Sequence, residues 1–235
     1  VVELINEGHK VTVVDTLERS ELKIIEGVEQ ITNSKIDFHK IDCLDFNSLD
    51  SLFSKNKFTA VIHFAAYKSV NESVALPIEY YKNNVGSLIT LLEVMKKHQV
   101  YDLIFSSSCT VYGQPDQVQV NESAPFKKPE SPYGSTKQVC EKILEDAATE
   151  KFRIISLRYF NPIGAHPSAL IGELPIGVPN NLVPYVTQTA AGIREKLLVF
   201  GNDYETTDGS CVRDFIHVCD VAIAHVKAIE YLNNR

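Results

Sequence analysis

The sequence has little of what a membrane protein or a nucleic-acid-binding protein needs. Its apolar runs fall well short of the roughly 20 residues that a membrane-spanning helix requires. Lysine and arginine together number 23 against 30 aspartates and glutamates, which gives a formal net charge of −7. Binding to a phosphate backbone needs a basic face, and this balance disfavours one. We therefore expect a soluble globular protein with neither a membrane nor a nucleic acid as its partner.

Cysteine is also sparse, and its positions are scattered. The five cysteines are odd in number, and no two have the close spacing of a structural metal site. This usage is typical of a reducing compartment, so we expect a cytoplasmic location. The seven histidines include no H-E-x-x-H motif, and we expect no metal site. The cysteines are Cys43, Cys109, Cys140, Cys211 and Cys219.

A glycine-rich phosphate loop is absent from the place where the surrounding pattern calls for one. The opening stretch VVELINEGHKVTVVD predicts the end of a helix, a turn at Gly8 and a strand that ends in Asp15. An acid that ends the second strand of a dinucleotide-binding fold holds the adenine ribose, and the glycine loop lies about 20 residues before it. We therefore expect a chain that begins inside the first helix and lacks the first strand and glycine loop. The alternative is that Asp15 merely ends a strand.

What the sequence does contain is an alternation of short β-branched runs with longer amphipathic ones. The short runs are nearly continuously apolar, as expected for strands covered on both faces. The alternation predicts an α/β fold with a doubly wound, Rossmann-like parallel sheet, in which ligands bind beyond the carboxyl ends of the strands. The expected strands cover residues 10–15, 35–42, 58–66, 102–108 and 152–160, and the expected helices cover residues 48–56, 78–99 and 135–149.

The expected helices carry apolar stripes, and one has a candidate cap. Ser48 is a plausible N-cap for the helix over residues 48–56. Proline and glycine become dense between residues 161 and 181, where regular sheet gives way to loops. We therefore divide the chain into a Rossmann-like domain of the dinucleotide-binding type, residues 1–162, and part of a smaller substrate-binding region, residues 163–235, interleaved with the first. The predicted stripes consist of Leu88, Leu91, Leu92 and Met95 on one helix and of Val139, Ile143 and Leu144 on another.

The stretch SPYGSTK places Tyr133 and Lys137 four residues apart, directly after Pro132. On a helix that begins at the proline, this spacing puts both side chains on one face. The stretch FSSSCTVYG brings Ser108 to the end of a buried strand, at the edge where ligands bind. A nearby ammonium lowers the pKa of a phenol, so such a trio can remove a proton from a sugar hydroxyl. The alternative is an ordinary Tyr–Lys pair on a helix surface.

Several longer stretches resemble the UDP-glucose (UDP-galactose) 4-epimerases of the extended short-chain dehydrogenase/reductase family. The resemblance covers essentially the whole chain, and its later blocks are far more specific than the Tyr-x-x-x-Lys spacing. It implies transient oxidation of UDP-galactose or UDP-glucose at sugar carbon 4 by tightly bound NAD. The stretches are VIHFAAYKSVNES, EYYKNNVGS, FSSSCTVYG, SPYGSTK, RYFNPIGAHPS, PNNLVPYV and VFGNDYETTDGSCVRDFIHVCDVA.

The resemblance also implies roles for individual residues. Tyr133 is the expected base, Lys137 its partner and the anchor of the nicotinamide ribose, and Ser108 the hydroxyl that relays the proton. For Arg213, expected on the diphosphate, the residues alone leave an ion pair with Asp214 as the alternative. The expected cofactor-binding residues are Asp15, Asp42, Cys43, Phe64, Ala65, Lys68, Asn83, Tyr133, Lys137 and Tyr159. The expected substrate-binding residues are Ser108, Tyr133, Phe160, Asn161, Asn181, Leu198, Phe200 and Arg213.

Three alternatives stay open on the sequence. One is another nucleotide-sugar enzyme, a decarboxylase or dehydratase, although such relatives carry an acid in the loop after the central strand, and SSSCTVYG has none. Another is a non-catalytic dinucleotide-binding protein, which the presence of both Tyr133 and Lys137 disfavours. The third concerns assembly, since the helices over residues 78–99 and 135–149 are candidates for the face of a paired-helix homodimer.

Overall fold

The structure is a computed structural model that describes residues 1–117, 119–148 and 151–234. The chain forms two compact units, each assembled from segments far apart in the sequence. The sheet unit consists of residues 12–16, 37–159 and 223–235, and the loop unit consists of residues 1–11, 17–36 and 160–222. The domain boundary expected between residues 162 and 163 stays a prediction.

The strand pairs of the sheet unit are all parallel. β1 (Thr12–Asp15) pairs with β2 (Asp37–Lys40), and β4 (Asp102–Ser106) pairs with both β3 (Ala60–His63) and β5 (Arg153–Leu157). The orders β2-β1 and β3-β4-β5 match the two sides of the classic doubly wound order, in which one further strand lies between them. No strand of the described residues occupies that central position. The expected α/β fold without its first strand is confirmed.

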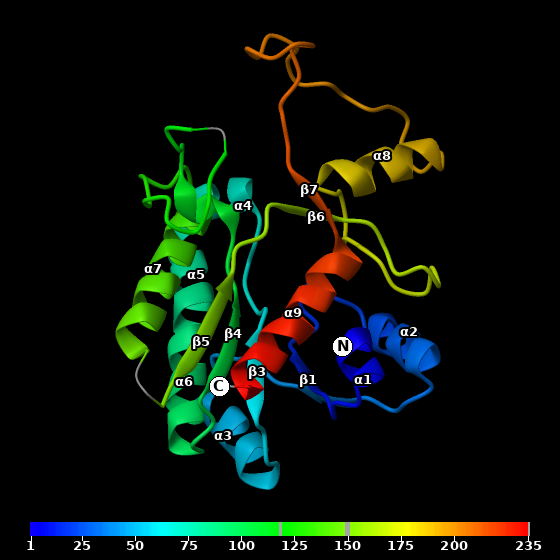
Figure 1. The fold of residues 1–235 in the computed structure, drawn as a ribbon. Coiled ribbons are helices and arrows are strands. Elements are labelled where there is room, and N and C mark those ends of the chain that lie inside the picture. Colours follow the sequence, from blue (N-terminus) through cyan, green and yellow to red (C-terminus); the bar gives the residue numbers. More distant parts are fainter. Residues whose placement is uncertain (118, 149–150, 235) are drawn as a thin grey trace. The chain divides into compact units, whose positions relative to one another are not determined.

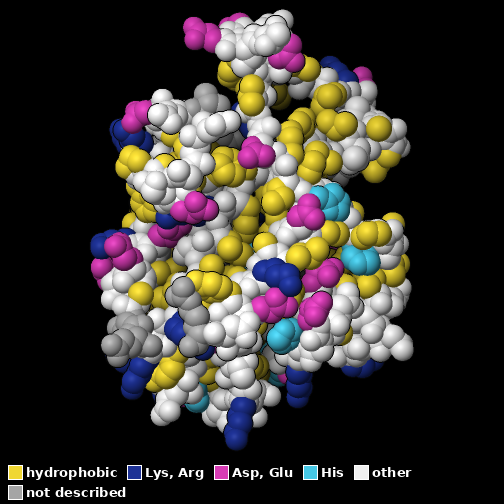
Figure 2. Space-filling view, viewed as in Figure 1, with side chains coloured by type: hydrophobic (Ala, Val, Ile, Leu, Met, Phe, Trp, Pro, Cys, Tyr) yellow, Lys and Arg dark blue, Asp and Glu magenta, His cyan; other side chains and the backbone are white. Residues whose placement is uncertain are grey.

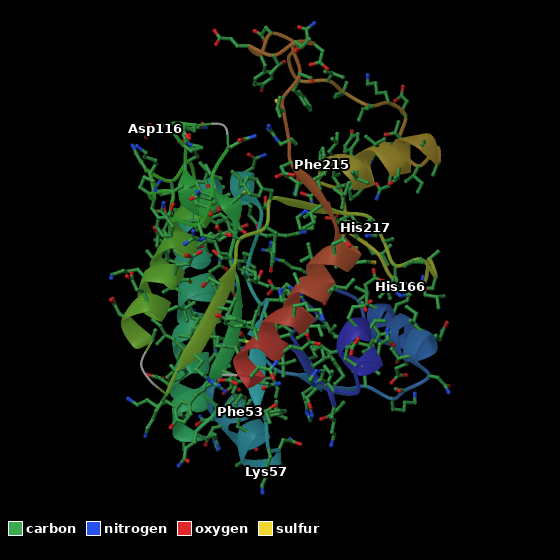
Figure 3. The ribbon with its side chains drawn as sticks, in the orientation of Figure 1. Phe53, Lys57, Asp116, His166, Phe215 and His217 are labelled. Atoms are coloured by element: carbon green, nitrogen blue, oxygen red, sulfur yellow. The ribbon has the colours of Figure 1, made fainter. Side chains whose placement is uncertain are left out.

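One hydrophobic core holds the sheet unit together. Helices α3 (Phe46–Lys55), α6 (Gly86–Lys97) and α7 (Pro132–Ala147) pack with β4 around it. Figure 1 shows α6 and α7 running alongside β4 and β5. The most deeply buried members contribute on the order of 2 kcal/mol each through the apolar area that they remove from water. The core includes Leu49, Phe53 (labelled in Figure 3), Leu88, Val94, Met95, Leu103 and Phe105.

The predicted helix over residues 78–99 is three helical segments in succession. α5 (Pro77–Tyr80) leads into a π-helical turn, η1 (Tyr81–Val85), and then into α6. Of the predicted stripe, Leu88, Leu91 and Met95 are buried, and Leu92 packs against the core. The stripe is therefore confirmed, although the π-helical turn has no counterpart in a 3.6-residue pattern.

Two details of the predicted helices are wrong. The N-cap of α3 is Asp45, whose carboxylate accepts hydrogen bonds from the Ser48 amide and hydroxyl, so Ser48 lies inside the helix. On α7, Val139 is 38% exposed, whereas Cys140 and Leu144 face the core. α7 starts at Pro132, as the position of that proline indicates and before the predicted bound at residue 135, and its N-cap is Ser131.

The loop unit contains little regular structure. Its β6 (Asn161–Ile163) pairs in parallel with β7 (Phe215–His217), and Figure 3 shows Phe215 and His217 on β7. Gly164 lies so close that a Cβ there would stand 2.5 Å from the His217 ring, which explains a glycine at φ +93. Its helices are α1 (Val2–Asn6), α2 (Lys23–Thr32) and α8 (Leu182–Ala190).

Three further helical elements complete the described chain. α4 (Val70–Ala75) and the 3₁₀ helix η2 (Cys109–Tyr112) belong to the sheet unit, while α9 (Val218–Asn233) begins in one unit and ends in the other. None of the helices in residues 1–117, 119–148 and 151–234 is both long and apolar enough to span a membrane.

Candidate active site

Tyr133 lies in the first turn of α7, and the sequence around it explains why the helix begins there. The Ser131 hydroxyl accepts a hydrogen bond from the Gly134 amide at 3.2 Å, and Pro132 occupies the first helical position, where its missing N–H costs nothing. Gly134 lies close to its neighbours: a Cβ there would stand 3.3 Å from Pro129 Cβ and 3.4 Å from the Thr110 carbonyl oxygen. The start of α7 is thereby held against the residues that follow β4.

The three predicted catalytic side chains meet at that point. The Ser108 hydroxyl lies beside the Tyr133 phenol, close enough to lower its pKa. The Lys137 ammonium donates a hydrogen bond to the Ser106 carbonyl oxygen at 2.6 Å and lies 5.9 Å from the centre of the Tyr133 ring. It also lies 4.8 Å from the centre of the Phe105 ring. The structure therefore brings Ser108, Tyr133 and Lys137 together at the carboxyl end of β4.

Burial dominates the electrostatics of the trio. It raises the pKa of Tyr133, and the neighbouring Ser108 hydroxyl opposes this only in part. Burial likewise lowers the pKa of Lys137 to about 8, because the side chain is 3% exposed and its ammonium loses most of its hydration. The Lys137 ammonium donates to the Ser106 carbonyl, and the expectation that it lowers the pKa of Tyr133 stays a prediction.

Three predicted cofactor residues follow β1 and β2 at the same edge of the sheet. Asp15 ends β1 with an exposed side chain, and Asp42 and Cys43 follow β2. Burial raises the pKa of the Cys43 thiol to about 11, and the nearby carboxylates of Asp42 and Asp15 raise it further. These carboxylates are therefore close neighbours, and Cys43 is a poor nucleophile at neutral pH.

The remaining cofactor residues follow β3 and β5 or lie on the π-helical turn. Phe64, Ala65 and Lys68 are exposed after β3. The Asn83 amide donates to the Asn84 side-chain oxygen at 3.0 Å. Burial raises the pKa of Tyr159, just after β5, to about 12. In the sheet unit, then, the expected residues lie where parallel strands end or beside those ends, which is where a doubly wound sheet binds ligands.

The sequence pattern missed a buried asparagine that links two of these segments. The Asn84 side chain, 2% exposed, accepts from the Tyr67 amide at 2.8 Å and donates to the Tyr67 carbonyl at 3.0 Å. It also donates to the Thr136 hydroxyl at 3.1 Å, which in turn donates to the Tyr133 carbonyl at 2.7 Å. Asn84 thus joins the segment after β3 to the turn that carries Tyr133. The sequence did contain a signal for Asn84, because this polar residue precedes Leu88 of the apolar stripe by four residues.

The predicted substrate residues other than Ser108 and Tyr133 belong to the loop unit. Asn161 donates its side-chain amide to the Asp214 carbonyl at 2.9 Å, and the Asn181 amide donates to Glu173. The Arg213 guanidinium donates to the Val212 carbonyl at 2.7 Å, and among the described residues it forms no ion pair with Asp214. Phe160, Leu198 and Phe200 are exposed, by 39%, 50% and 84% respectively.

The loop unit also exposes apolar side chains on α8. Leu182 is 58% exposed and Val186 is 38% exposed. Figure 2 shows hydrophobic side chains gathered over this helix. In the part of the chain that the structure describes, no cluster of three or more His, Cys, Asp or Glu side chains could hold a metal ion.

Fold and site together define an α/β protein of the dinucleotide-binding type with a Ser–Tyr–Lys site at its sheet edge. Residues 1–235 match the model of the NAD dependent epimerase/dehydratase family. The chain belongs to this family.

Individual relatives and solved structures are similar to this chain in more specific ways than the family model shows. The chain is 50% identical over 237 residues to the UDP-glucose 4-epimerase of Dictyostelium discoideum, matching all of this chain and 69% of that protein. It is 50% identical over 239 residues to the bifunctional protein gal10 of Schizosaccharomyces pombe, matching 99% of this chain and 33% of that protein. The crystal structure of UDP-glucose 4-epimerase from Bifidobacterium longum with NAD+ and UDP is 47% identical, with a TM-score of 0.94, and covers 97% of this chain and 69% of that one.

Proposed function

We propose that the protein interconverts UDP-galactose and UDP-glucose, using NAD to oxidise and then reduce carbon 4 of the sugar. The observation that supports this best is the meeting of Ser108, Tyr133 and Lys137 at the carboxyl end of β4. Relatives about 50% identical over the whole chain are UDP-glucose 4-epimerases, and one solved relative holds both NAD+ and UDP.

The residues at the strand ends have the chemistry that NAD needs. Carboxylates such as Asp15 accept hydrogen bonds from ribose hydroxyls, and the Lys137 ammonium donates to the hydroxyls of the second ribose. When bound, NAD takes up the hydride from carbon 4 and returns it. Asp42 and Cys43 would flank the adenine, and the segment from Phe64 to Lys68 would line the cofactor cleft with Asn83 and Tyr159.

The protein's own residues would move the proton. As the C–H bond at carbon 4 breaks and the hydride leaves, the 4-hydroxyl loses its proton to the Tyr133 phenolate, through the Ser108 hydroxyl. Burial alone favours the neutral phenol, so the phenolate needs further positive charge, which the oxidised nicotinamide supplies. The proton returns by the same route when the hydride comes back to the opposite face of the keto sugar.

The loop after β4 favours epimerisation over elimination or decarboxylation. Those reactions need an acid or base beside the keto sugar, and residues 106–113 contain neither Asp nor Glu. Reduction is then the main path open to the intermediate. Phe160 and Asn161 would lie beside the sugar, Asn181, Leu198 and Phe200 beside the uridine, and Arg213 at the diphosphate, where a planar guanidinium matches two phosphate oxygens.

The cellular location and the oligomeric state are proposals as well. We place the protein in the cytoplasm on the basis of its five free cysteines. Homodimerisation through the helices over residues 78–99 and 135–149 likewise stays a prediction.

The decisive variant is Tyr133→Phe, measured in the full-length protein with UDP-galactose as substrate. Loss of the general base lowers kcat by about 10²–10⁴-fold while the aromatic ring and its packing remain. Tyr101→Phe is the matched control, since this ring packs on Phe152 with centroids 5.3 Å apart and has no place in the site. Near-normal kcat for Tyr133→Phe would remove the tyrosine from the mechanism, and an inactive unsubstituted protein would contradict the proposed function itself.

A further inference from the structure

We propose that Glu141 and Arg158 are positioning residues that hold the segment carrying Ser106 and Ser108 in its working geometry. We call residues 106–112 the relay loop, because they contain the acceptor of the Lys137 ammonium and the partner of the Tyr133 phenol. This inference rests on the proposed function and extends it to two residues outside the predicted site.

The first support is the place of Glu141 on α7. Tyr133, Lys137 and Glu141 follow one another at intervals of four residues, so they lie along one side of the helix. The Glu141 side chain is 8% exposed, and a carboxylate this deeply buried needs charged or hydrogen-bonding partners. Arg158 supplies a bidentate partner, with Nε 2.9 Å from Oε1 and Nη2 2.6 Å from Oε2. The two charges therefore form a rigid pair next to the catalytic face of the helix.

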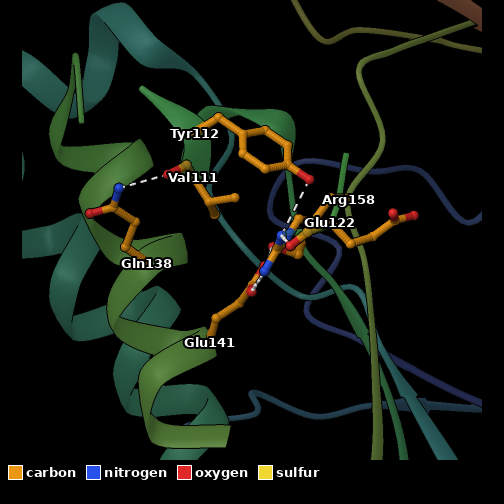
Figure 4. Close-up of polar contacts among 7 residues, drawn as sticks. Val111, Tyr112, Glu122, Gln138, Glu141 and Arg158 are labelled. Carbon is orange, nitrogen blue, oxygen red and sulfur yellow. Dashed lines mark hydrogen bonds and ion pairs between the residues drawn. The ribbon is translucent and has the colours of Figure 1, made fainter. Parts of the chain in front are cut away.

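The second support is what this pair binds. The Ser107 hydroxyl donates to Glu141, which fixes the first part of the relay loop between Ser106 and Ser108. At the other end of the loop, Arg158 Nη1 donates to the Tyr112 hydroxyl at 3.2 Å, and the guanidinium lies 5.2 Å from the centre of that ring. Figure 4 shows Glu141, Arg158 and Tyr112 joined in this way.

A third contact, from α7, holds the loop at Val111, next to Tyr112. Gln138 donates from its amide nitrogen to the Val111 carbonyl at 2.8 Å and to the Lys127 carbonyl at 2.7 Å. Contacts from α7, together with Arg158, thus bind the relay loop at its start and near its end. Because Ser108 lies between the fixed points, a loss of the Glu141–Arg158 pair moves the hydroxyl and the Ser106 carbonyl relative to the phenol and the ammonium. Misplacement of about 1 Å is enough to slow a reaction severely.

The sheet offers a matched control pair. Asp102 and Arg153 form a second bidentate pair, with Nε 2.7 Å from Oδ1 and Nη2 2.5 Å from Oδ2, in which the Arg153 side chain is 39% exposed. The Asp102 side chain is 6% exposed, similar to Glu141. This pair joins the first residues of β4 and β5, at the opposite end of the strands from the relay loop. Breaking either pair would lower the stability of the protein. Only the loss of the Glu141–Arg158 pair would also displace the relay loop.

The experiment compares Glu141→Gln, Ser107→Ala and Asp102→Asn in the full-length protein. We expect Glu141→Gln to lower kcat at least tenfold with the KM for UDP-galactose within twofold of the parent, and Ser107→Ala to lower kcat three- to tenfold. Asp102→Asn should keep kcat within twofold even where its urea midpoint falls. Hydrogen exchange in peptides covering residues 105–113 should be faster in the first two variants and unchanged in the third.

The kinetic results distinguish a positioning role of the Glu141–Arg158 pair from a purely structural one. Equal losses of kcat in Glu141→Gln and Asp102→Asn would reduce the Glu141 pair to a structural role, and unchanged kcat in Glu141→Gln would overturn the proposal. If Glu141→Gln does not fold, Ser107→Ala decides, since it removes one hydrogen bond and leaves the ion pair intact. If the unsubstituted protein shows no epimerase activity, the proposed function fails, and hydrogen exchange still decides whether Glu141 holds the relay loop.

Discussion

At the scale of single residues, the charge on Lys137 has a measurable effect on stability. Burial lowers its pKa to about 8 from 10.5, so between these values the unfolded chain binds more protons than the folded one. The desolvation penalty is fully present below pH 8 and is relieved as the pH rises to 10.5. Relative to Lys137→Met, the free energy of unfolding of the parent should therefore rise by on the order of 2–3 kcal/mol across that window.

Urea unfolding at pH 7.5 and 10.5 measures this difference. Lys142→Met is the control, because Lys142 lies on the same helix with a 63% exposed side chain and pairs with Glu145 and Asp146 at the surface. Its replacement should not produce a rise over the same window. A parent whose stability tracks that of Lys137→Met at both pH values would show that the ammonium is better solvated than its burial indicates.

Residue identity predicted the members of the site better than it predicted their ionisation. The four-residue spacing of Tyr133 and Lys137 and the serine run after a buried strand were sufficient to expect that they meet. The raised pKa of Tyr133 was not foreseeable, because desolvation depends on side chains from distant parts of the chain. Asn84 was missed for a similar reason, since its partners Tyr67 and Thr136 lie 17 and 52 residues away.

At the scale of elements, Asp45 and Ser48 are two candidate N-caps of α3, and their replacement should affect stability differently. Asp45 accepts from the Ser48 amide at 3.2 Å and from its hydroxyl, so the carboxylate satisfies a backbone donor that the first helical turn leaves open. Asp45→Ala should lower the free energy of unfolding by about 1 kcal/mol. Ser48→Ala, which keeps the amide donor, should cost clearly less. Thermal or urea unfolding of both variants measures which one loses more free energy of unfolding. A larger loss for Ser48→Ala than for Asp45→Ala would identify serine as the N-cap.

Strand positions were predictable because most of the strands read as short apolar or β-branched runs between longer amphipathic ones. All five expected strands of the sheet unit form within a few residues of their predicted bounds. Helix faces were less secure. Val139 fits an apolar stripe by spacing, yet the side of α7 that turns inward carries Lys137 and Glu141, whose partners Ser106 and Arg158 come from other elements. A periodic pattern assumes that buried means apolar, and functional sites break that assumption.

At the scale of the whole molecule, the groups available at the edge of the sheet determine how tightly the 235-residue chain should bind a dinucleotide. A Rossmann-like fold binds the pyrophosphate with backbone amides of a glycine-rich loop at a helix N-terminus, beside the central strand. The sequence contains no G-x-G-x-x-G, and no strand of the described residues lies between β1 and β3. The groups that remain are those for the two riboses and the adenine. We therefore expect the purified 235-residue chain to retain well below one NAD per molecule.

Release of cofactor on denaturation measures this expectation directly. The chain is purified without added NAD and denatured, and the nucleotide in the supernatant is quantified against protein. The UDP-glucose 4-epimerase of Bifidobacterium longum, whose crystal structure holds NAD+, is the reference when prepared in the same way, and it should release more NAD per chain. Because the proposed carboxylates and one ammonium would contact only hydroxyl groups, they would leave the two phosphate charges without donors. Stoichiometric NAD from the 235-residue chain would mean that other backbone amides in it bind the pyrophosphate.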